Sequence, residues 1–179
     1  MNFLDFYKSM LNEIGDTVST PPGLTMNMNR LGDSICKFTH DGDDYSVEIS
    51  ILMRDDMDES AVKLALGIDF GVGEIAGNSF SLTNKNQPLK IMSYIIGTLS
   101  EWLTKYQQKY YPEGALSIIY IKYDPKSEED EEYGDNGNKR DRIYRMFIEK
   151  FAKRMNSTVK FSDHRFGVDA MFKPPLQIK

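Results

Sequence analysis

The sequence predicts an α+β fold in which a mixed, mostly antiparallel sheet carries flanking helices. Three patterns carry this prediction: residues 62–72 alternate between apolar and other side chains, residues 89–106 repeat apolar side chains every three or four positions, and residues 116–123 are largely apolar. These patterns are typical of a strand with one buried face, an amphipathic helix and a central strand covered by helices. A chain of 179 residues, 40% of them hydrophobic, is long enough for one domain with its own core.

Charge and composition argue against several classes of protein. The net charge of −5 does not favour a general nucleic-acid binder, which needs a basic surface. The single cysteine, Cys36, cannot form an internal disulfide and fits a reducing compartment. The N-terminal sequence MNFLDFYKSMLNEIGD carries charges throughout and lacks the apolar core of a signal peptide, and no apolar run approaches the roughly 20 residues of a transmembrane helix. We therefore expect a soluble protein, either inside a cell or in a particle assembled there.

The N-terminal third predicts a helix, a connector and the first strands. Residues 1–18 form a helix, because their apolar side chains share one helical face. Residues 19–34 are rich in Pro, Gly and Asn and form a connector, and the main domain then covers 35–173. Its first strand is at 35–39, and the turn at 40–44 leads into a second. Inward residues are predicted to be Leu4, Tyr7, Leu11 and Ile14 in the helix, and Tyr45, Val47, Ile49, Ile51 and Met53 in the second strand.

The remaining elements follow in order. Residues 62–72 pair with 45–53 as a hairpin, 78–83 add a short strand, and Pro88 opens the long helix with Gln87 as its N-cap. After the central strand, an acidic loop spans 124–137, and Asn138 caps a basic helix. Strands at 158–161 and 166–171 close the fold. Pro174 and Pro175 end it, which leaves an extended tail at 174–179.

Residues with catalytic or metal-binding potential are few. Cys36 is predicted to be a structural thiol and His164 to lie in a surface turn, while the histidine and acids of 40–44 lack EF-hand spacing and fit a hairpin turn. The acids at 55–59 share one loop, which indicates a solvated loop rather than a two-metal site. The start of the long helix, at 84–87, offers free N–H groups to an anion, a property of every strand-to-helix junction.

The order of elements over about 45–172 resembles the core of the GNAT acetyltransferase superfamily. In that family a loop of Arg/Gln-x-x-Gly-x-Gly/Ala type binds the pyrophosphate of acetyl-CoA, whereas the equivalent stretch here, TNKNQPL at 83–89, has no glycine. The family's later helix carries an Asn-x-x-Ala-x-x-Leu-Tyr motif, which Asn138, Ile143 and Tyr144 match, with Asp141 at the small residue's position. The resemblance implies, for an acetyltransferase, Tyr144 as general acid and Asn84, Asn86 and Gln87 as cofactor-binding residues.

A second resemblance is to a set of small bacteriophage proteins, whose later helix has a Ser-Arg-x-x-Leu-Tyr pattern. Arg140, Ile143 and Tyr144 match this pattern in part. The resemblance implies a location in the host cytoplasm or the virion.

Three functions remain open. The first expectation is a non-enzymatic phage protein that binds a protein partner, because the glycine loop and a catalytic constellation are missing. Its contact surfaces are expected to be the acidic loop 124–137 and the N-terminal helix, unless the apolar face of that helix covers the protein's own sheet. The alternative is an acetyl-CoA-dependent N-acetyltransferase with a divergent cofactor loop. Nucleic-acid binding by the basic helix 139–154 is the least favoured, because the whole chain is acidic.

Overall fold

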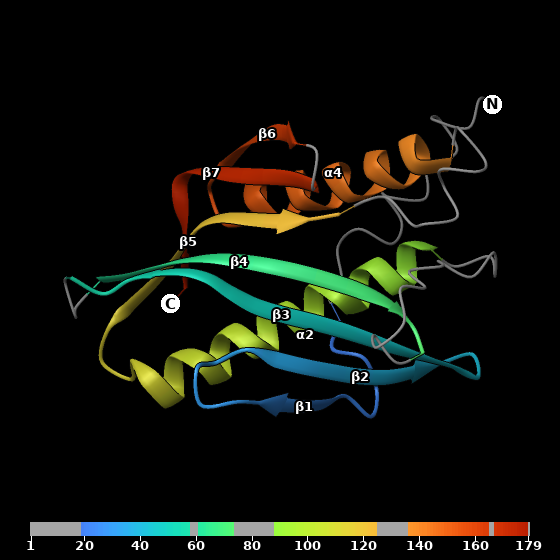
Figure 1. Ribbon diagram of the computed structural model, residues 1–179, viewed down its shortest axis with the longest axis horizontal. Coiled ribbons are helices and arrows are strands. Elements are labelled where there is room, and N and C mark those ends of the chain that lie inside the picture. Colours follow the sequence, from blue (N-terminus) through green and yellow to red (C-terminus); the bar gives the residue numbers. More distant parts are fainter. Residues whose placement is uncertain (1–18, 58–60, 74–87, 125–135, 165–166, 179) are drawn as a thin grey trace.

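The computed structural model describes residues 19–57, 61–73, 88–124, 136–164 and 167–178. They form a seven-stranded sheet of order β1-β2-β3-β4-β5-β7-β6 with helices packed on it (Figure 1). The β4–β5 pair is parallel and every other pair is antiparallel, which confirms the predicted α+β class with a mixed, mostly antiparallel sheet. The elements are β1 (Thr25–Met28), β2 (Ser34–His40), β3 (Asp43–Asp55), β4 (Ala61–Val72), α2 (Pro88–Tyr110), β5 (Ala115–Tyr123), α4 (Asn136–Arg154), β6 (Thr158–His164) and β7 (Gly167–Ile178).

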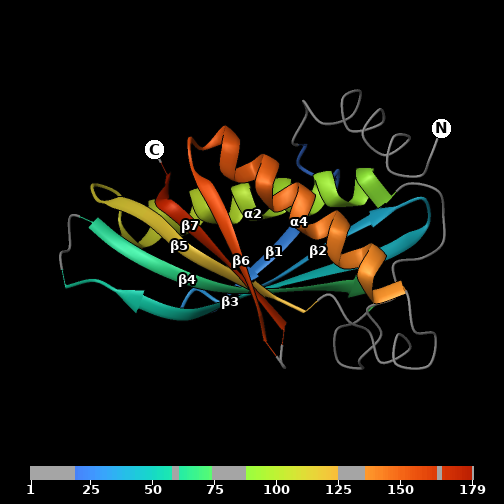
Figure 2. The same ribbon diagram turned by 90° about the horizontal axis from the view of Figure 1, so that it is seen from above.

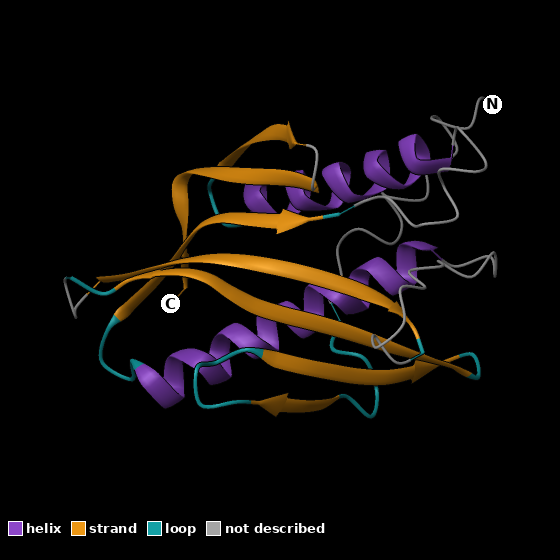
Figure 3. Ribbon diagram, viewed as in Figure 1, coloured by secondary structure: helices purple, strands orange, loops and turns teal. Residues whose placement is uncertain are grey.

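Helices α2 and α4 lie on the same face of the sheet, as the view from above and the secondary-structure colouring show (Figures 2 and 3). Side chains from both helices enclose one apolar cavity with side chains of β4 and β5, so the two helices share a core with the middle of the sheet. Each fully buried leucine, isoleucine or aromatic side chain in this core contributes about 1.5–3 kcal/mol to folding. The largest fully buried side chains are Trp102, Tyr106, Ile49, Leu64, Leu66, Leu99, Leu103, Leu116, Ile118, Leu176 and Val47.

Strand β5 is central, as predicted, but helices do not cover both of its faces in the described structure. Its pairing with β4 moves from Leu64↔Ile118 to Ala65↔Tyr120, so Ile119 is an extra residue in the ladder. A β-bulge of this kind shifts the alternation of side chains by one. The apolar run at 116–123 therefore reflects the bulge at Ile119 as well as the burial of β5.

A second irregularity corrects the prediction that Met53 points inward. The register of β3 against β4 shifts between Ile51 and Met53, which leaves Leu52 as the extra residue. Met53 consequently lies across from Ala65 on the other face of the sheet, and its side chain is 40% exposed. Strict alternation from Tyr45 would have buried it.

Both ends of the predicted main domain extend further than expected. The predicted connector 19–34 contains strand β1, which pairs with β2. The predicted tail 174–179 contains the end of β7, where Leu176 pairs with Ile118 and is fully buried. The prolines do not end the strand, because Pro174 and Pro175 occupy the register shift between Met171 and Leu176, where no proline N–H needs to reach β5.

Other predictions hold, differ slightly or lie outside the described residues. Asp41 and Gly42 have φ values of 51° and 82°, as in a tight hairpin turn, which confirms the turn at 40–44. Helix α2 begins at Pro88 as predicted. Helix α4 begins at Asn136, so Asn138 belongs to its first turn instead of preceding it. The predicted helix 1–18, the strand 78–83 and most of the acidic loop lie outside the described residues.

Candidate functional site

Tyr144, the predicted general acid, lies in the protein core. Its side chain is 5% exposed, and its ring meets those of Phe70 and Tyr123 edge to face, at 5.2 and 5.6 Å between centroids. It lines an apolar cavity of about 40 Å³ between the sheet and the two helices. The cavity is lined by Ile68, Phe70, Met92, Ile95, Ile96, Leu99, Ile121, Tyr123, Tyr144, Ile148 and Phe151.

Strands β4 and β5 diverge beside this cavity. They pair as far as Gly67 and Lys122, after which β4 continues to Val72 on β3, while Tyr123 pairs with Val168 of β7. Helix α2 follows β4, and α4 follows β5, in the chain. Carboxyl ends of parallel strands, where the following helices begin, are a common place for ligands in open sheets.

The volume and lining of the cavity can be compared with the acetyl group of acetyl-CoA, the cofactor that the GNAT resemblance implies. A volume of about 40 Å³ has room for roughly three water molecules, which suits a group of a few heavy atoms such as acetyl. Its apolar and aromatic lining also suits an acyl group. The predicted pyrophosphate-binding residues Asn84, Asn86 and Gln87 lie outside the described residues.

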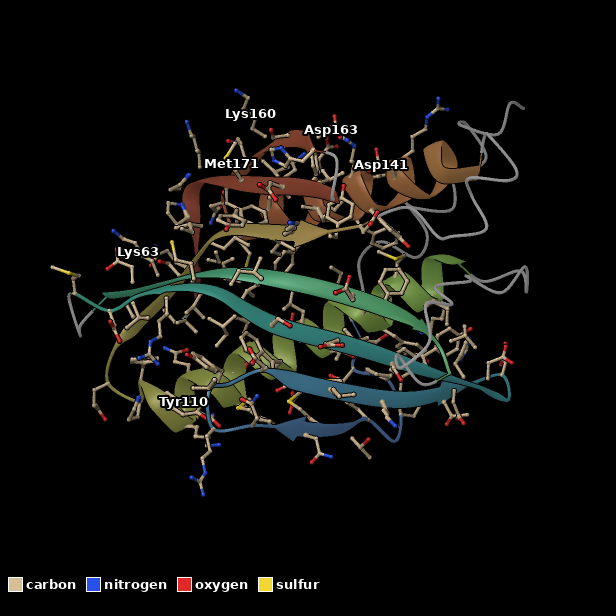
Figure 4. All side chains as sticks on the ribbon, viewed as in Figure 1. Lys63, Tyr110, Asp141, Lys160, Asp163 and Met171 are labelled. Carbon is tan, nitrogen blue, oxygen red and sulfur yellow. The ribbon has the colours of Figure 1, made fainter. Side chains whose placement is uncertain are left out.

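A polar network next to the cavity joins α4 to β5 and β6. Asp141 accepts hydrogen bonds from the Tyr123 hydroxyl at 3.1 Å and from Arg145 Nε at 2.6 Å, and Arg145 also pairs with Asp163 of β6. Figure 4 shows Asp141 and Asp163 close together at the top of the view. Burial and then the neighbouring Asp141 raise the pKa of Tyr123 above its usual range. Because these groups satisfy one another, the network fastens α4 to β6 rather than presenting a free acid or base.

The exposed apolar side chains come from two short segments of the chain, one from the β1–β2 turn to the start of β2 and one at the end of β3. All five large hydrophobic side chains that are exposed in the described structure fall within residues 31–35 and 52–57. Leu31 is 73% exposed and Met57 is 96% exposed. We call this group, which is Leu31, Ile35, Leu52, Met53 and Met57, the loop-end surface.

Hydrogen bonds hold the two segments of the loop-end surface together. Within the β1–β2 turn, Asn29 Oδ1 accepts from the N–H groups of Leu31 and Gly32, at 2.8 and 2.9 Å. Asp33 Oδ1 accepts from the N–H of Ile51 at 2.8 Å, which ties the turn to β3 directly before Leu52. The turn is therefore ordered by its own side chains and presents Leu31 beside the end of β3.

An aromatic series on α2 leads from the core to this end of the molecule. Trp102 stacks on Tyr106 at 5.0 Å, and Tyr106 packs against Tyr110 and Tyr111 at 4.8 and 5.9 Å. Burial raises the pKa of Tyr106 to about 12, so this hydroxyl stays protonated at neutral pH. Tyr110 donates its hydroxyl to the carbonyl of Asn29 at 3.1 Å, which connects the end of α2 to the β1–β2 turn.

Beside the loop-end surface lies an open groove of about 510 Å³. It lies between the chain after β3 and the α2–β5 turn, the latter held by a hydrogen bond from Gln107 Nε2 to the carbonyl of Gly114 at 3.0 Å. Figure 4 shows Tyr110 at this end of α2. The groove is lined by Asp56, Tyr110, Tyr111, Pro112, Glu113 and Gly114.

The other candidate residues, Cys36 and His164, lie in surroundings that suit a structural role. Cys36 is fully buried, and burial raises the pKa of its thiol to about 12, which suits the predicted structural role. His164 lies at the end of β6, where its Nε2 is 3.0 Å from Asp169 Oδ2. Across the residues that the structure describes, no group of three or more His, Cys, Asp or Glu side chains is placed to hold a metal ion.

The sequence did not single out the loop-end surface or the groove. Leu52 and Met53 continue an apolar strand. Alternation from Tyr45 already places Leu52 on the outward face, and the bulge between Ile51 and Met53 turns Met53 outward as well. The one available signal was Met57, an apolar residue within the acidic loop 55–59.

Comparison with known proteins assigns neither site. Within the described residues, no helix combines the length and hydrophobicity that crossing a bilayer requires. No protein-family model, curated protein or solved structure matches this chain.

Proposed function

We propose that this protein acts without catalysis, by binding a protein partner through the loop-end surface. The observation that carries the proposal is that every large exposed hydrophobic side chain in the described structure comes from two short segments, the first of which is tied to β3 by the Asp33 hydrogen bond. Contiguous exposed apolar patches often mark interaction sites, and Met, Tyr and Arg are enriched in interfaces. Tyr110, Tyr111 and Arg54 adjoin the patch in the sequence or across the groove. The resemblance to small bacteriophage proteins supports a virion component or a host factor as the partner.

The order of the β1–β2 turn strengthens this proposal. A surface that is held in place before binding loses less conformational entropy when the partner docks. The hydrogen bonds that the side chains of Asn29 and Asp33 accept, and the one that the Tyr110 hydroxyl donates, supply that order.

An affinity capture with a matched pair of baits tests the proposal. The variant Leu31→Ser/Met53→Ser/Met57→Ser should retain its melting temperature within a few degrees, because substitutions at exposed positions away from special contacts shift stability by about 0.5 kcal/mol or less each. We expect it to capture the partner at least about tenfold less than the wild-type protein, since interface anchors commonly contribute more than about 1 kcal/mol each. Lys160→Ser, on the exposed edge strand β6, is the control and should capture normally. Equal capture by the triple variant contradicts the proposal.

We propose acetyl-CoA-dependent N-acetyltransfer as the second candidate function. The divergence of β4 and β5 next to an acyl-sized cavity lined by Tyr144 favours it. When bound, acetyl-CoA would supply the activated acetyl group. Ile68, Phe70 and Ile121 would surround that group and exclude water, and Tyr144 would supply a proton to the leaving thiolate.

Thermal denaturation with acetyl-CoA tests this second function. A ligand present at about 100 times its Kd stabilises the folded state by about 2.7 kcal/mol, so the melting temperature should rise by several degrees. Tyr144→Phe preserves the ring contacts and should keep this rise while losing acetyl transfer. ATP, which has phosphates but no acyl-pantetheine arm, is the control ligand. An unchanged melting temperature at millimolar acetyl-CoA contradicts the function.

A further inference from the structure

We propose that two copies of this chain associate through β1, which pairs antiparallel with the β1 strand of the second copy to form one continuous sheet. Strand β1 is at one edge of the sheet, and among the described residues no strand pairs with its outer side. Figure 1 shows it as the lowest strand of the sheet. This association goes beyond the proposed function, which uses the loop-end surface.

The backbone groups of Met26 and Met28 point away from β2. The N–H of Asn29 donates to the carbonyl of Asp33 at 2.9 Å, and this pair continues the register of β1 with β2. Hydrogen-bonded and non-hydrogen-bonded pairs alternate in an antiparallel ladder. Asn27 therefore bonds to β2, whereas Met26 and Met28 present their N–H and C=O groups at the edge. A strand that joins this edge must place its own outward groups opposite these two residues.

A second copy of β1 meets this requirement, because the sequence Met26-Asn27-Met28 is symmetric about its central residue. A two-fold dimer needs a surface that is complementary to itself. In an antiparallel pair centred on Asn27, Met26 of each copy lies across from Met28 of the other, and each such pair exchanges both of its N–H···O bonds. The half-buried methionine side chains, which pack against the core, then lie side by side across the junction.

The side chains of β1 do not oppose this pairing. Lysine, other charged residues and proline commonly protect a sheet edge from pairing with another chain. The other edge strand, β6, carries Lys160, Asp163 and His164, whereas β1, with the sequence TMNM, has neither charge nor proline. Asn27 is exposed, and in the dimer the two Asn27 carboxamides lie opposite one another at the two-fold axis, where each can donate and accept a hydrogen bond.

A charge exchange at Asn27 tests the association. In sedimentation equilibrium from micromolar to millimolar concentration, we expect the mass of the wild-type protein to rise from 20.6 kDa towards twice that value. Asn27→Asp and Asn27→Lys each place like charges across the two-fold axis, and each should weaken the association at least about tenfold. An equimolar mixture of the two variants pairs Asp with Lys and should restore association, most strongly at low salt. Lys160→Asp, at an exposed position of β6, is the matched control and should associate as the wild-type protein does.

Three results would overturn the inference, and none of them decides the proposed function. A wild-type protein that stays monomeric at millimolar concentration overturns the association itself, and slow hydrogen exchange at the Met26 and Met28 amides of that monomer would mean that another part of the chain covers the edge. Association that Asn27→Asp leaves unchanged overturns β1 as the site. A mixture that stays dissociated, although each variant keeps the wild-type melting temperature, does the same. The capture experiment uses substitutions in the loop-end surface, so it tests the proposed function independently.

Discussion

Replacing Trp102 with alanine is expected to lower the free energy of unfolding by about 4 kcal/mol, a large part of the 5–15 kcal/mol that a domain typically has. The indole is fully buried, stacks on Tyr106, and donates from Nε1 to the carbonyl of Gly32 and to Ser34 Oγ, each at 3.0 Å. The substitution leaves a large cavity and a buried carbonyl without its donor. Because Trp102 is the single tryptophan of the chain, urea unfolding of the variants is followed by circular dichroism.

Trp102→Phe separates the hydrogen bonds from the packing. Phenylalanine keeps most of the buried ring but has no N–H donor, so we expect a loss of about 1–3 kcal/mol, the cost of an unsatisfied buried polar group together with a smaller cavity. Equal stability of Trp102→Ala and the wild-type protein would mean that the indole does not hold the β1–β2 turn against α2.

Gly32→Ala is expected to lower the free energy of unfolding by about 2–4 kcal/mol. Gly32 has a φ of +101°, a conformation that disfavours any Cβ. A Cβ at this position would also meet the Tyr106 ring and would lie 2.8 Å from Ile51 Cδ1. The backbone strain and the steric overlap add together, since the turn and the buried ring cannot both keep their positions. Urea unfolding followed by Trp102 fluorescence measures the effect.

Gly23→Ala is the matched control for Gly32→Ala. Gly23 also has a positive φ, of +69°, but a Cβ there would have no heavy atom within 4 Å. This control reports the conformational cost alone, which we expect to be about 1 kcal/mol. If the two variants lose the same stability, the contact between Gly32 and Tyr106 contributes nothing beyond backbone conformation.

Much of the fold follows from the local sequence pattern. The predicted and observed elements differ where pairing with a neighbouring strand decides whether a segment is a strand. The alternation from Val62 to Val72 and the helical spacing after Pro88 are long enough to identify their elements. Strand β1 has four residues, too few for a clear period, and it is a strand because β2 is beside it. The last residues of β7 follow two prolines, and a register shift that no local pattern encodes accommodates them.

The candidate sites were harder to predict than the fold. Tyr144 was singled out by resemblance, and it lies at a cavity, but burial among Phe70 and Tyr123 cannot be inferred from a motif. The groove combines residues from the chain after β3 and from the α2–β5 turn, which are far apart in sequence. Exposure depends on which face of a strand each residue occupies, and one bulge at Leu52 changes that face.

The position of β5 in the sheet affects how the chain folds. Strands β1 to β4 pair with one another in chain order, so they can assemble through short loop closures, and β6 and β7 do the same. The pairings of β5 instead join residues far apart in the chain, because α2 lies between β4 and β5, and α4 and β6 lie between β5 and β7. Contacts of high sequence separation form more slowly. The sheet thus consists of two locally paired blocks, β1–β4 and β6–β7, with β5 between them. Partial opening along either side of β5 would separate the blocks while each kept its own hydrogen-bonded strands.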